Sequence, residues 1–122
     1  MVAVPAAVSP VVAVDLYLEA LVDKDLARIP FADDVRFADP LLPAPLTCKI
    51  AALAFLEPLL PAINAIDIER HVVDGNLVAT QWVAHTVWGA IPIFELFRVV
   101  DGLIVEMEAY FDPRPIVAAQ GG

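Results

Sequence analysis

Cysteine, histidine and basic residues are scarce in this chain, and their scarcity excludes several classes of protein. The 122 residues include one cysteine, two histidines and seven lysines and arginines, against sixteen acidic residues. A single cysteine, Cys48, cannot form an intrachain disulfide, so we expect a cytoplasmic protein. His71, His85 and Cys48 are widely spaced in the sequence, so we expect no metal site.

The deficit of basic residues also argues against polyanionic partners. The net charge is −9, and the isoelectric point is about 4.3. Binding to nucleic acid or to an anionic membrane surface requires a basic patch that attracts phosphate groups. We therefore predict no nucleic-acid partner and no membrane partner.

Apolar residues are abundant for a chain of this length. They make up 60% of the sequence, and the mean hydropathy is +0.74. A chain of 122 residues forms one domain. The apolar excess suggests an apolar cavity, a subunit interface, or both.

Neither long apolar segment is predicted to enter or cross a membrane. Residues 75–94 carry no charge but include Asn76, Gln81 and Pro92 and alternate like a strand. Residues 1–14 contain no basic residue and two prolines, which is atypical of a signal peptide. We expect an N-terminal arm at residues 1–10, one domain at 11–115 and a flexible tail at 116–122.

The first half of the chain has helical periodicity. Ser9 followed by Pro10 predicts the start of an amphipathic helix over residues 11–22. The pattern then predicts, in order, a short helical segment at 24–29, a turn at 32–34, a strand at 35–38, an irregular proline-rich loop at 40–46 and a helix at 48–60 capped by Thr47. Cys48 is expected to be buried.

From residue 65 onward the apolar period changes to two, which is typical of strands. Four strands are predicted, at residues 66–73, 77–88, 93–100 and 103–111. Asp74-Gly75-Asn76 and Asp101-Gly102 predict hairpins, and residues 88–92 a third turn. Helices followed by antiparallel strands predict an α+β fold in which a curved sheet wraps around the helices.

Alternation also assigns faces within the last two strands. Residues 103, 105, 107, 109 and 111 share an apolar face. In the strand before it, each face holds one charge: one face has Ile93, Glu95, Phe97 and Val99, and the other has Phe94, Leu96, Arg98 and Val100. Arg98 has a long stem and can reach solvent from an apolar face, whereas Glu95 cannot. If Glu95 faces the interior, it is an acid held among apolar side chains.

Two further polar residues lie at sites where function is plausible. Asp39 ends a predicted strand and precedes Pro40, so it is either a turn former or a base in an apolar pocket. Tyr17 lies beside the buried stripe of the first helix, where tyrosine is commonly a core residue. Glu95 has its own alternative, an ion pair at a subunit interface.

Three segments carry a resemblance to a known family. The order of elements resembles the cone-shaped nuclear-transport-factor-2-like (SnoaL-like) fold. Within that fold, Tyr17-Leu18-Glu19-Ala20-Leu21, Ala32-Asp33-Asp34 through Asp39-Pro40, and Pro92 through Arg98 are similar to segments of bacterial Δ5-3-ketosteroid isomerase. The resemblance covers most of residues 11–115.

The resemblance implies a role for each of these polar residues. Asp39 would be the general base, and Tyr17 and a protonated Glu95 would form the oxyanion hole. The activity would be a cofactor-independent shift of a β,γ double bond into conjugation with a ketone. The substrate would be a small hydrophobic ketone or steroid-like ligand. We expect the pocket wall to include Phe37, Phe55, Trp82, Ala84, Phe97, Met107 and Ala109.

Other functions on the same fold remain open. Epoxide hydrolases of the limonene type place an Arg-Asp pair and a second Asp at the positions of Trp82, Ala84 and Ala109, so their chemistry is excluded. A polyketide-cyclase-like enzyme, a non-catalytic protein that binds a small apolar ligand, and a dimerisation domain with a filled cavity are alternatives. We also expect a homodimer through the outer face of the sheet.

Overall fold

The computed structural model describes residues 9–121 and confirms the α+β class. Its elements are, in chain order, α1 (Pro10–Asp23), η1 (Leu26–Arg28), β1 (Phe31–Ala38), α2 (Lys49–Leu56), η2 (Glu57–Ala62), β2 (Ile63–Asp74), β3 (Leu77–Thr86), β4 (Gly89–Val100), β5 (Leu103–Tyr110) and α3 (Arg114–Gly121). Within this part of the chain, no helix is both long and apolar enough to span a membrane.

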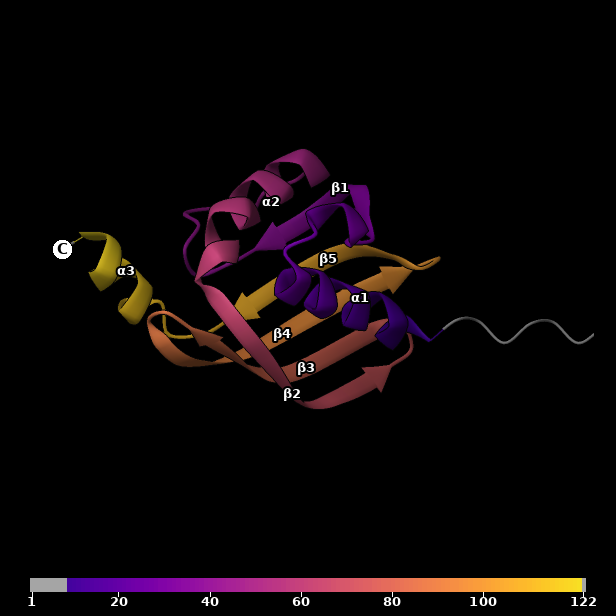
Figure 1. The fold of residues 1–122 in the computed structure, drawn as a ribbon. Helices are drawn as coiled ribbons and strands as arrows, with labels where there is room; N and C mark the ends of the chain where they lie inside the picture. Colours follow the sequence, from indigo (N-terminus) through magenta and orange to yellow (C-terminus); the bar gives the residue numbers. More distant parts are fainter. Residues whose placement is uncertain (1–8, 122) are drawn as a thin grey trace, which may run out of the picture.

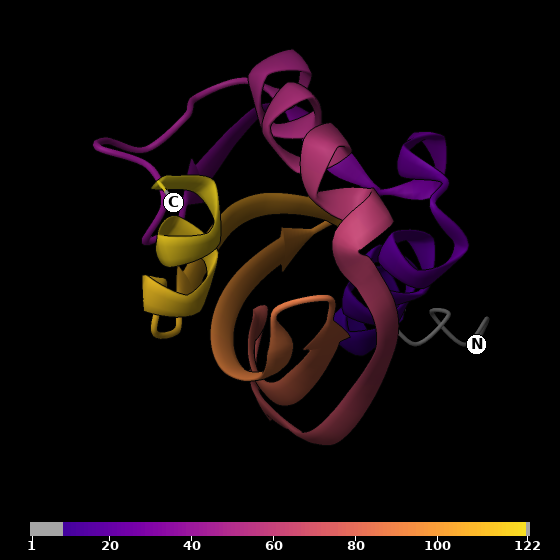
Figure 2. The same cartoon turned by 60° about the vertical axis from the view of Figure 1, so that its left-hand side comes forward.

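The strands form one curved sheet in the order β1-β5-β4-β3-β2. The four later strands pair antiparallel, as predicted, whereas β1 joins the edge parallel to β5. Helices α1 and α2 cover the concave face (Figure 1), and α3 lies at one end of the sheet (Figure 2). The apolar core therefore lies between the two helices and the sheet.

Helix α1 begins and ends as local chemistry dictates. Ser9 Oγ accepts a hydrogen bond from the Val11 N–H, and Pro10 occupies the first turn, where its missing N–H costs nothing. Lys24 ends the helix in the left-handed conformation with φ of 61°. Its ammonium group donates hydrogen bonds to the carbonyl oxygens of Leu60 and Ile63, which joins the end of α1 to β2.

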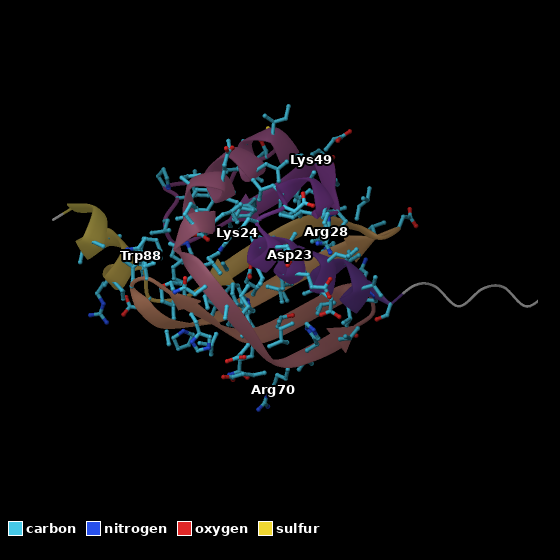
Figure 3. The ribbon with its side chains drawn as sticks, viewed as in Figure 1. Asp23, Lys24, Arg28, Lys49, Arg70 and Trp88 are labelled. Carbon is cyan, nitrogen blue, oxygen red and sulfur yellow. The ribbon has the colours of Figure 1, made fainter. Side chains whose placement is uncertain are left out.

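Charged side chains gather at this end of α1. Arg28 Nη1 donates to Asp23 Oδ2 at 2.6 Å, and Asp23, Lys24 and Arg28 lie near one another around the helix end (Figure 3). These groups are exposed, so the pair contributes little to stability in water. The Lys24 contacts, in contrast, fix where α1 lies on the sheet.

The predicted turn at residues 32–34 is wrong, because strand β1 already begins at Phe31. The pairing of β1 with β5 shifts register between Phe31 and Arg36. Asp33 and Asp34 are both exposed in this irregular stretch, although a regular strand would turn one of them inward. The acidic pair therefore marks a bulge.

Helix α2 differs from the prediction at both ends. Cys48, rather than Thr47, is the N-cap, and its Sγ accepts from the Ala51 N–H at 3.5 Å. Cys48 is exposed, so the prediction of a buried cysteine is wrong. The helix ends at Leu56 and continues as a 3₁₀ segment, because Pro58 and Pro61 lack the N–H groups an α-helix needs.

The predicted hairpin turns at Gly75-Asn76 and Asp101-Gly102 are confirmed. Asp101 and Gly102 both have positive φ, which a tight hairpin requires. The third turn is at residues 87–88, and residues 89–92 belong to β4. In β5 a shift of register places Ile104 in the core and leaves Val105 half-buried, against the predicted face.

The chain termini give two further comparisons with the prediction. Residues 116–121 of the predicted flexible tail lie in α3. This helix packs on the domain through Ile116, which is 6% exposed. Of the predicted N-terminal arm, residues 1–8 lie outside the described residues, and Pro10 already belongs to α1.

Candidate active site

An apolar pocket lies at the end of the sheet near α3, with Ile116 of that helix in its lining. The space within it is about 630 Å³ when the open solvent at its mouth is counted. Its predicted members are Tyr17, Asp39, Trp82, Ala84, Glu95 and Ala109. The three polar residues singled out from the sequence therefore share one pocket. The cavity is not filled by side chains, which argues against the alternative of a dimerisation domain with a filled cavity.

The other predicted wall residues lie behind the pocket. Phe37, Phe55, Phe97 and Met107 are absent from its lining and pack in or against the core, where the rings of Phe37 and Phe55 lie 5.5 Å apart. Strand periodicity correctly turned Phe37, Phe97 and Met107 inward. It could not say how far along each strand the pocket extends.

The pocket wall extends beyond the residues that the sequence analysis expected there. The additional wall residues are Leu21, Leu41, Leu56, Leu59, Ile63, Thr86, Trp88, Ile91, Ile93, Phe111 and Ile116. Five of them, Leu41, Leu59, Trp88, Phe111 and Ile116, lie in the proline loop, η2, the β3–β4 turn and the C-terminal segment. The proline-rich loop at residues 40–46 was a signal for Leu41, since it follows Asp39 directly. No local pattern indicated Ile116.

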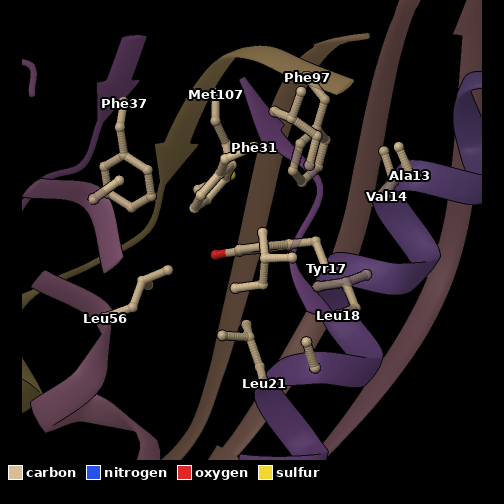
Figure 4. Packing of buried hydrophobic residues seen from close by; sticks show 14 of the residues in the cluster. Ala13, Val14, Tyr17, Leu18, Leu21, Phe31, Phe37, Leu56, Phe97 and Met107 are labelled. Atoms are coloured by element: carbon tan, nitrogen blue, oxygen red, sulfur yellow. The ribbon is translucent and has the colours of Figure 1, made fainter. Parts of the chain in front are cut away.

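Helix α1 positions Tyr17. The ring is 3% exposed and lies against Phe31 and Phe97, with ring centroids 6.0 and 5.7 Å away. The hydroxyl points away from α1 toward the interior, on the side of Leu56 (Figure 4). Burial raises the pKa of the phenol well above its usual value, and the nearby carboxyl groups of Glu95 and Asp39 raise it further. Tyr17 therefore stays protonated and can act as a hydrogen-bond donor.

The loop after β1 holds Asp39. Its Oδ1 accepts a hydrogen bond from the Leu41 N–H at 2.8 Å, so Asp39 does form a turn as well as face the pocket. The loop is closed by backbone hydrogen bonds between Phe37 and Leu46. Desolvation raises the pKa of Asp39 to about 6, and the Leu41 N–H opposes that rise by stabilising the carboxylate.

Strand β4 turns Glu95 inward, as the face argument allowed. Glu95 is 1% exposed, and its Oε1 accepts a hydrogen bond from the Trp82 indole N–H at 2.9 Å. Trp82 faces Ile93 across the β3–β4 pair, which makes Trp82 and Glu95 diagonal neighbours on the same face. The predicted alternative of an ion pair at a subunit interface is wrong, because Glu95 lies in the pocket.

The environment of Glu95 favours its neutral form. Burial and, to a smaller extent, the negative charge of Asp39 raise the pKa of Glu95 to about 8, although the Trp82 hydrogen bond opposes the rise. At neutral pH, Asp39 is therefore mostly ionised and Glu95 mostly protonated. Ketosteroid isomerase itself is the well-known example of a carboxylic acid kept neutral by an apolar site.

The pocket thus combines one base with two neutral donors. Among residues 9–121, no lysine, arginine or histidine lines it. The described residues also contain no group of three or more metal-ligating side chains. An ionised carboxylate can abstract a proton from a bound molecule, while a phenol and a carboxylic acid stabilise an oxyanion.

The fold and the pocket together define a nuclear-transport-factor-2-like protein with a candidate acid–base site. More specifically, the chain belongs to the SnoaL-like domain family, whose model matches residues 14–107. No curated protein matches this chain significantly in sequence.

Solved structures agree on the fold. One Kribbella flavida protein is 20% identical, has a TM-score of 0.81 and aligns over 89% of this chain and 91% of its own. Another Kribbella flavida protein, provisionally assigned as a ketosteroid isomerase, is 18% identical with a TM-score of 0.74, over 84% of this chain and 77% of its own.

An M. tuberculosis epoxide hydrolase of the limonene type is also similar. It is 18% identical, with a TM-score of 0.70, over 93% of this chain and 96% of its own. At such identities the similarity shows a shared fold alone. The chemistry must therefore be argued from the pocket.

Proposed function

We propose that this protein is a cofactor-independent isomerase of the ketosteroid isomerase type. Its substrate is a small hydrophobic β,γ-unsaturated ketone, of which 3-ketosteroids are examples, and its product is the conjugated enone. The observation that carries the proposal is that Asp39 and Glu95 share one apolar pocket, which raises the pKa of Asp39 to about 6 and that of Glu95 to about 8. When two carboxyl groups in one pocket have different pKa values, the group with the lower pKa can act as the base and the group with the higher pKa as the acid.

The reaction needs one proton to move twice. The Asp39 carboxylate takes the proton from the carbon between the carbonyl and the double bond, and the electron pair moves toward the carbonyl oxygen. Tyr17 and Glu95 donate hydrogen bonds to the resulting dienolate oxygen. The protonated Asp39 then returns the proton to the γ carbon, and the double bond becomes conjugated. No oxidant, reductant or second substrate is needed.

The test is direct, because the conjugated product absorbs in the ultraviolet where the substrate does not. Wild-type protein should convert a β,γ-unsaturated 3-ketosteroid. Asp39→Asn should lose about 10²–10⁴-fold in rate, the usual contribution of a general base. It should still bind the product enone, because an asparagine Oδ1 can also accept the Leu41 N–H.

Asp34→Asn is the matched control, since Asp34 carries the same side chain, lies in β1 and is exposed. It should keep wild-type turnover. Absence of turnover in wild-type protein, or its retention in Asp39→Asn, would refute the isomerase proposal.

Ligand binding without catalysis is the second candidate. It is favoured by the Asp39–Leu41 hydrogen bond, which gives Asp39 a structural role of its own. In that case wild-type protein binds hydrophobic ketones, shows no turnover, and Asp39→Asn changes only affinity. A polyketide-cyclase-like activity would use the same base, and formation of a ring in the product would distinguish it.

A further inference from the structure

The hydrogen bond between Trp82 and Glu95 involves a donor that cannot reverse its role. An indole N–H donates and has no lone pair with which to accept. The Trp82 Nε1 lies 2.9 Å from Glu95 Oε1, and both side chains are at most 3% exposed. Whatever the protonation state of Glu95, its Oε1 must therefore serve as the acceptor for Trp82.

This constraint decides where the proton of neutral Glu95 lies. In a carboxylic acid the carbonyl oxygen is the stronger acceptor, and the other oxygen carries the proton. Because Trp82 donates to Oε1, the hydrogen bond is strongest when the proton is on Oε2. Glu95 Oε2 has no hydrogen-bond partner among residues 9–121. Every fully buried polar side-chain atom in this part of the chain has a partner, so Oε2 is not fully buried. Because Glu95 lines the pocket, Oε2 opens on it.

We infer that Trp82 is a positioning residue that fixes the proton of Glu95 on Oε2 and directs it toward the oxygen of the bound ketone. The inference rests on the proposed role of Glu95 as an oxyanion donor and extends it to a residue that was expected only to form the pocket wall. Trp82 need not touch the substrate oxygen to act in this way.

The same contact limits how far burial can favour the neutral acid. A hydrogen bond to a carboxylate stabilises the charged form, so Trp82 lowers the pKa of Glu95 against the effects of desolvation and Asp39. Removal of the indole N–H should therefore raise that pKa. It should also free the carboxyl group to place its proton on either oxygen.

The first test uses Trp82→Phe, which keeps an aromatic ring and removes the donor. We expect kcat to fall by about 2- to 13-fold, the equivalent of one hydrogen bond. The high-pH limb of the kcat/KM profile, where the rate falls as Glu95 loses its proton, should move to higher pH. A purely structural role would lower stability or raise KM without moving this limb, and that result would overturn the inference.

Trp88→Phe is the matched control, because Trp88 is the only other tryptophan in the chain and also lines the pocket. Whatever it does to KM, this substitution should leave the high-pH limb where it is in the wild type. An equal shift in both variants would mean that loss of any pocket tryptophan moves the limb, and would count against Trp82 as a specific positioning residue.

The second test needs no turnover and no folded Trp82 variant. With two tryptophans, a ¹⁵N-labelled protein gives two indole N–H signals. The Trp82 signal should shift with pH as Glu95 titrates, and the Trp88 signal should not follow it. In Glu95→Gln the Trp82 signal should be independent of pH. A Trp82 signal that ignores pH in wild-type protein would refute the inference.

The two tests separate this inference from the proposed function. If wild-type protein turns over no ketone but the Trp82 signal follows Glu95, the isomerase proposal fails and the Trp82–Glu95 coupling stands. If ketones turn over while the Trp82 indole signal does not change with pH and Trp82→Phe keeps the wild-type pH profile, the isomerase proposal stands and the inference about Trp82 fails.

Discussion

Asp39 and Leu41 are joined by a hydrogen bond of 2.8 Å from the Leu41 N–H to Asp39 Oδ1. The contact holds the candidate base at the end of β1 and stabilises its charged form, while the apolar surroundings disfavour that form. Burial has the larger effect, and the pKa of Asp39 rises to about 6. A carboxylate of this kind is ionised at neutral pH yet more basic than one in water.

The first prediction concerns the pH dependence of turnover. The rate should rise as pH increases through about 6, because Asp39 must lose its proton to act as a base. It should fall as pH increases through about 8, because Glu95 then loses the proton that it donates. A bell-shaped profile of kcat/KM, which reports groups of the free enzyme, would confirm both limbs.

Glu95→Gln is the control for the upper limb of this profile. An amide donates a hydrogen bond without titrating, so the limb near pH 8 should disappear and the limb near pH 6 should remain. An upper limb that survives in Glu95→Gln would mean that another group causes it.

The second prediction concerns the two donors. Tyr17→Phe should slow turnover by roughly 10²-fold or more, a typical cost of one lost oxyanion donor. Glu95→Gln should be milder, because glutamine keeps a donor at the same place. Single-turnover rates with a saturating β,γ-unsaturated ketone separate these effects from binding. Equal rates in wild-type protein and Tyr17→Phe would exclude the phenol from the oxyanion hole.

The third prediction concerns the dependence of stability on pH. The folded state raises the pKa of Glu95 from 4.5 to about 8, so folding favours the protonated form. The resulting stabilisation is complete below pH 4.5 and is lost as pH rises through 8. The free energy of unfolding of wild-type protein should therefore decline over this range, relative to Glu95→Gln, by a few kcal/mol.

Urea denaturation at several pH values measures this difference. Glu69→Gln is the control, because Glu69 is an exposed glutamate on β2 and its replacement removes the same charge. It should keep the wild-type slope of stability against pH. A wild-type slope in Glu95→Gln as well would show that burial of Glu95 does not govern the pH dependence.

The fourth prediction concerns assembly. The predicted dimer face on the outer side of the sheet comprises Val83, Val87, Phe94, Leu96 and Val100, and all five are exposed or half-buried in the single chain. Phe94 is 45% exposed, and its ring packs against Tyr110. An apolar face of this kind favours self-association, so we expect a homodimer.

Sedimentation measures the assembly directly. Wild-type protein should sediment as a dimer at micromolar concentration, and Phe94→Glu should sediment as a monomer. Ile50→Glu is the control, because Ile50 is 81% exposed but lies on α2, away from the outer face of the sheet. A monomeric wild-type protein would refute the prediction.

Local patterns in the sequence determined the elements and most of their faces. Ser9 and Pro10 start α1, and Gly75 and Gly102 lie in the two predicted hairpin turns. The two-residue period places Glu95 on the inward face of β4. These features depend on neighbours in the chain, which is why they could be predicted. Where a local signal was weak, as at Thr47 and residues 32–34, the boundaries were wrong.

The tertiary structure alone decided what the pocket contains. Whether Phe97 or Ile93 lines it depends on depth along a strand, which the two-residue period does not encode. Ile116 lines it because α3 packs against the domain, and Trp82 donates to Glu95 because the β3–β4 register makes them diagonal neighbours. Both relationships join residues through space, and the raised pKa values of Asp39 and Glu95 follow from burial that only the assembled fold produces.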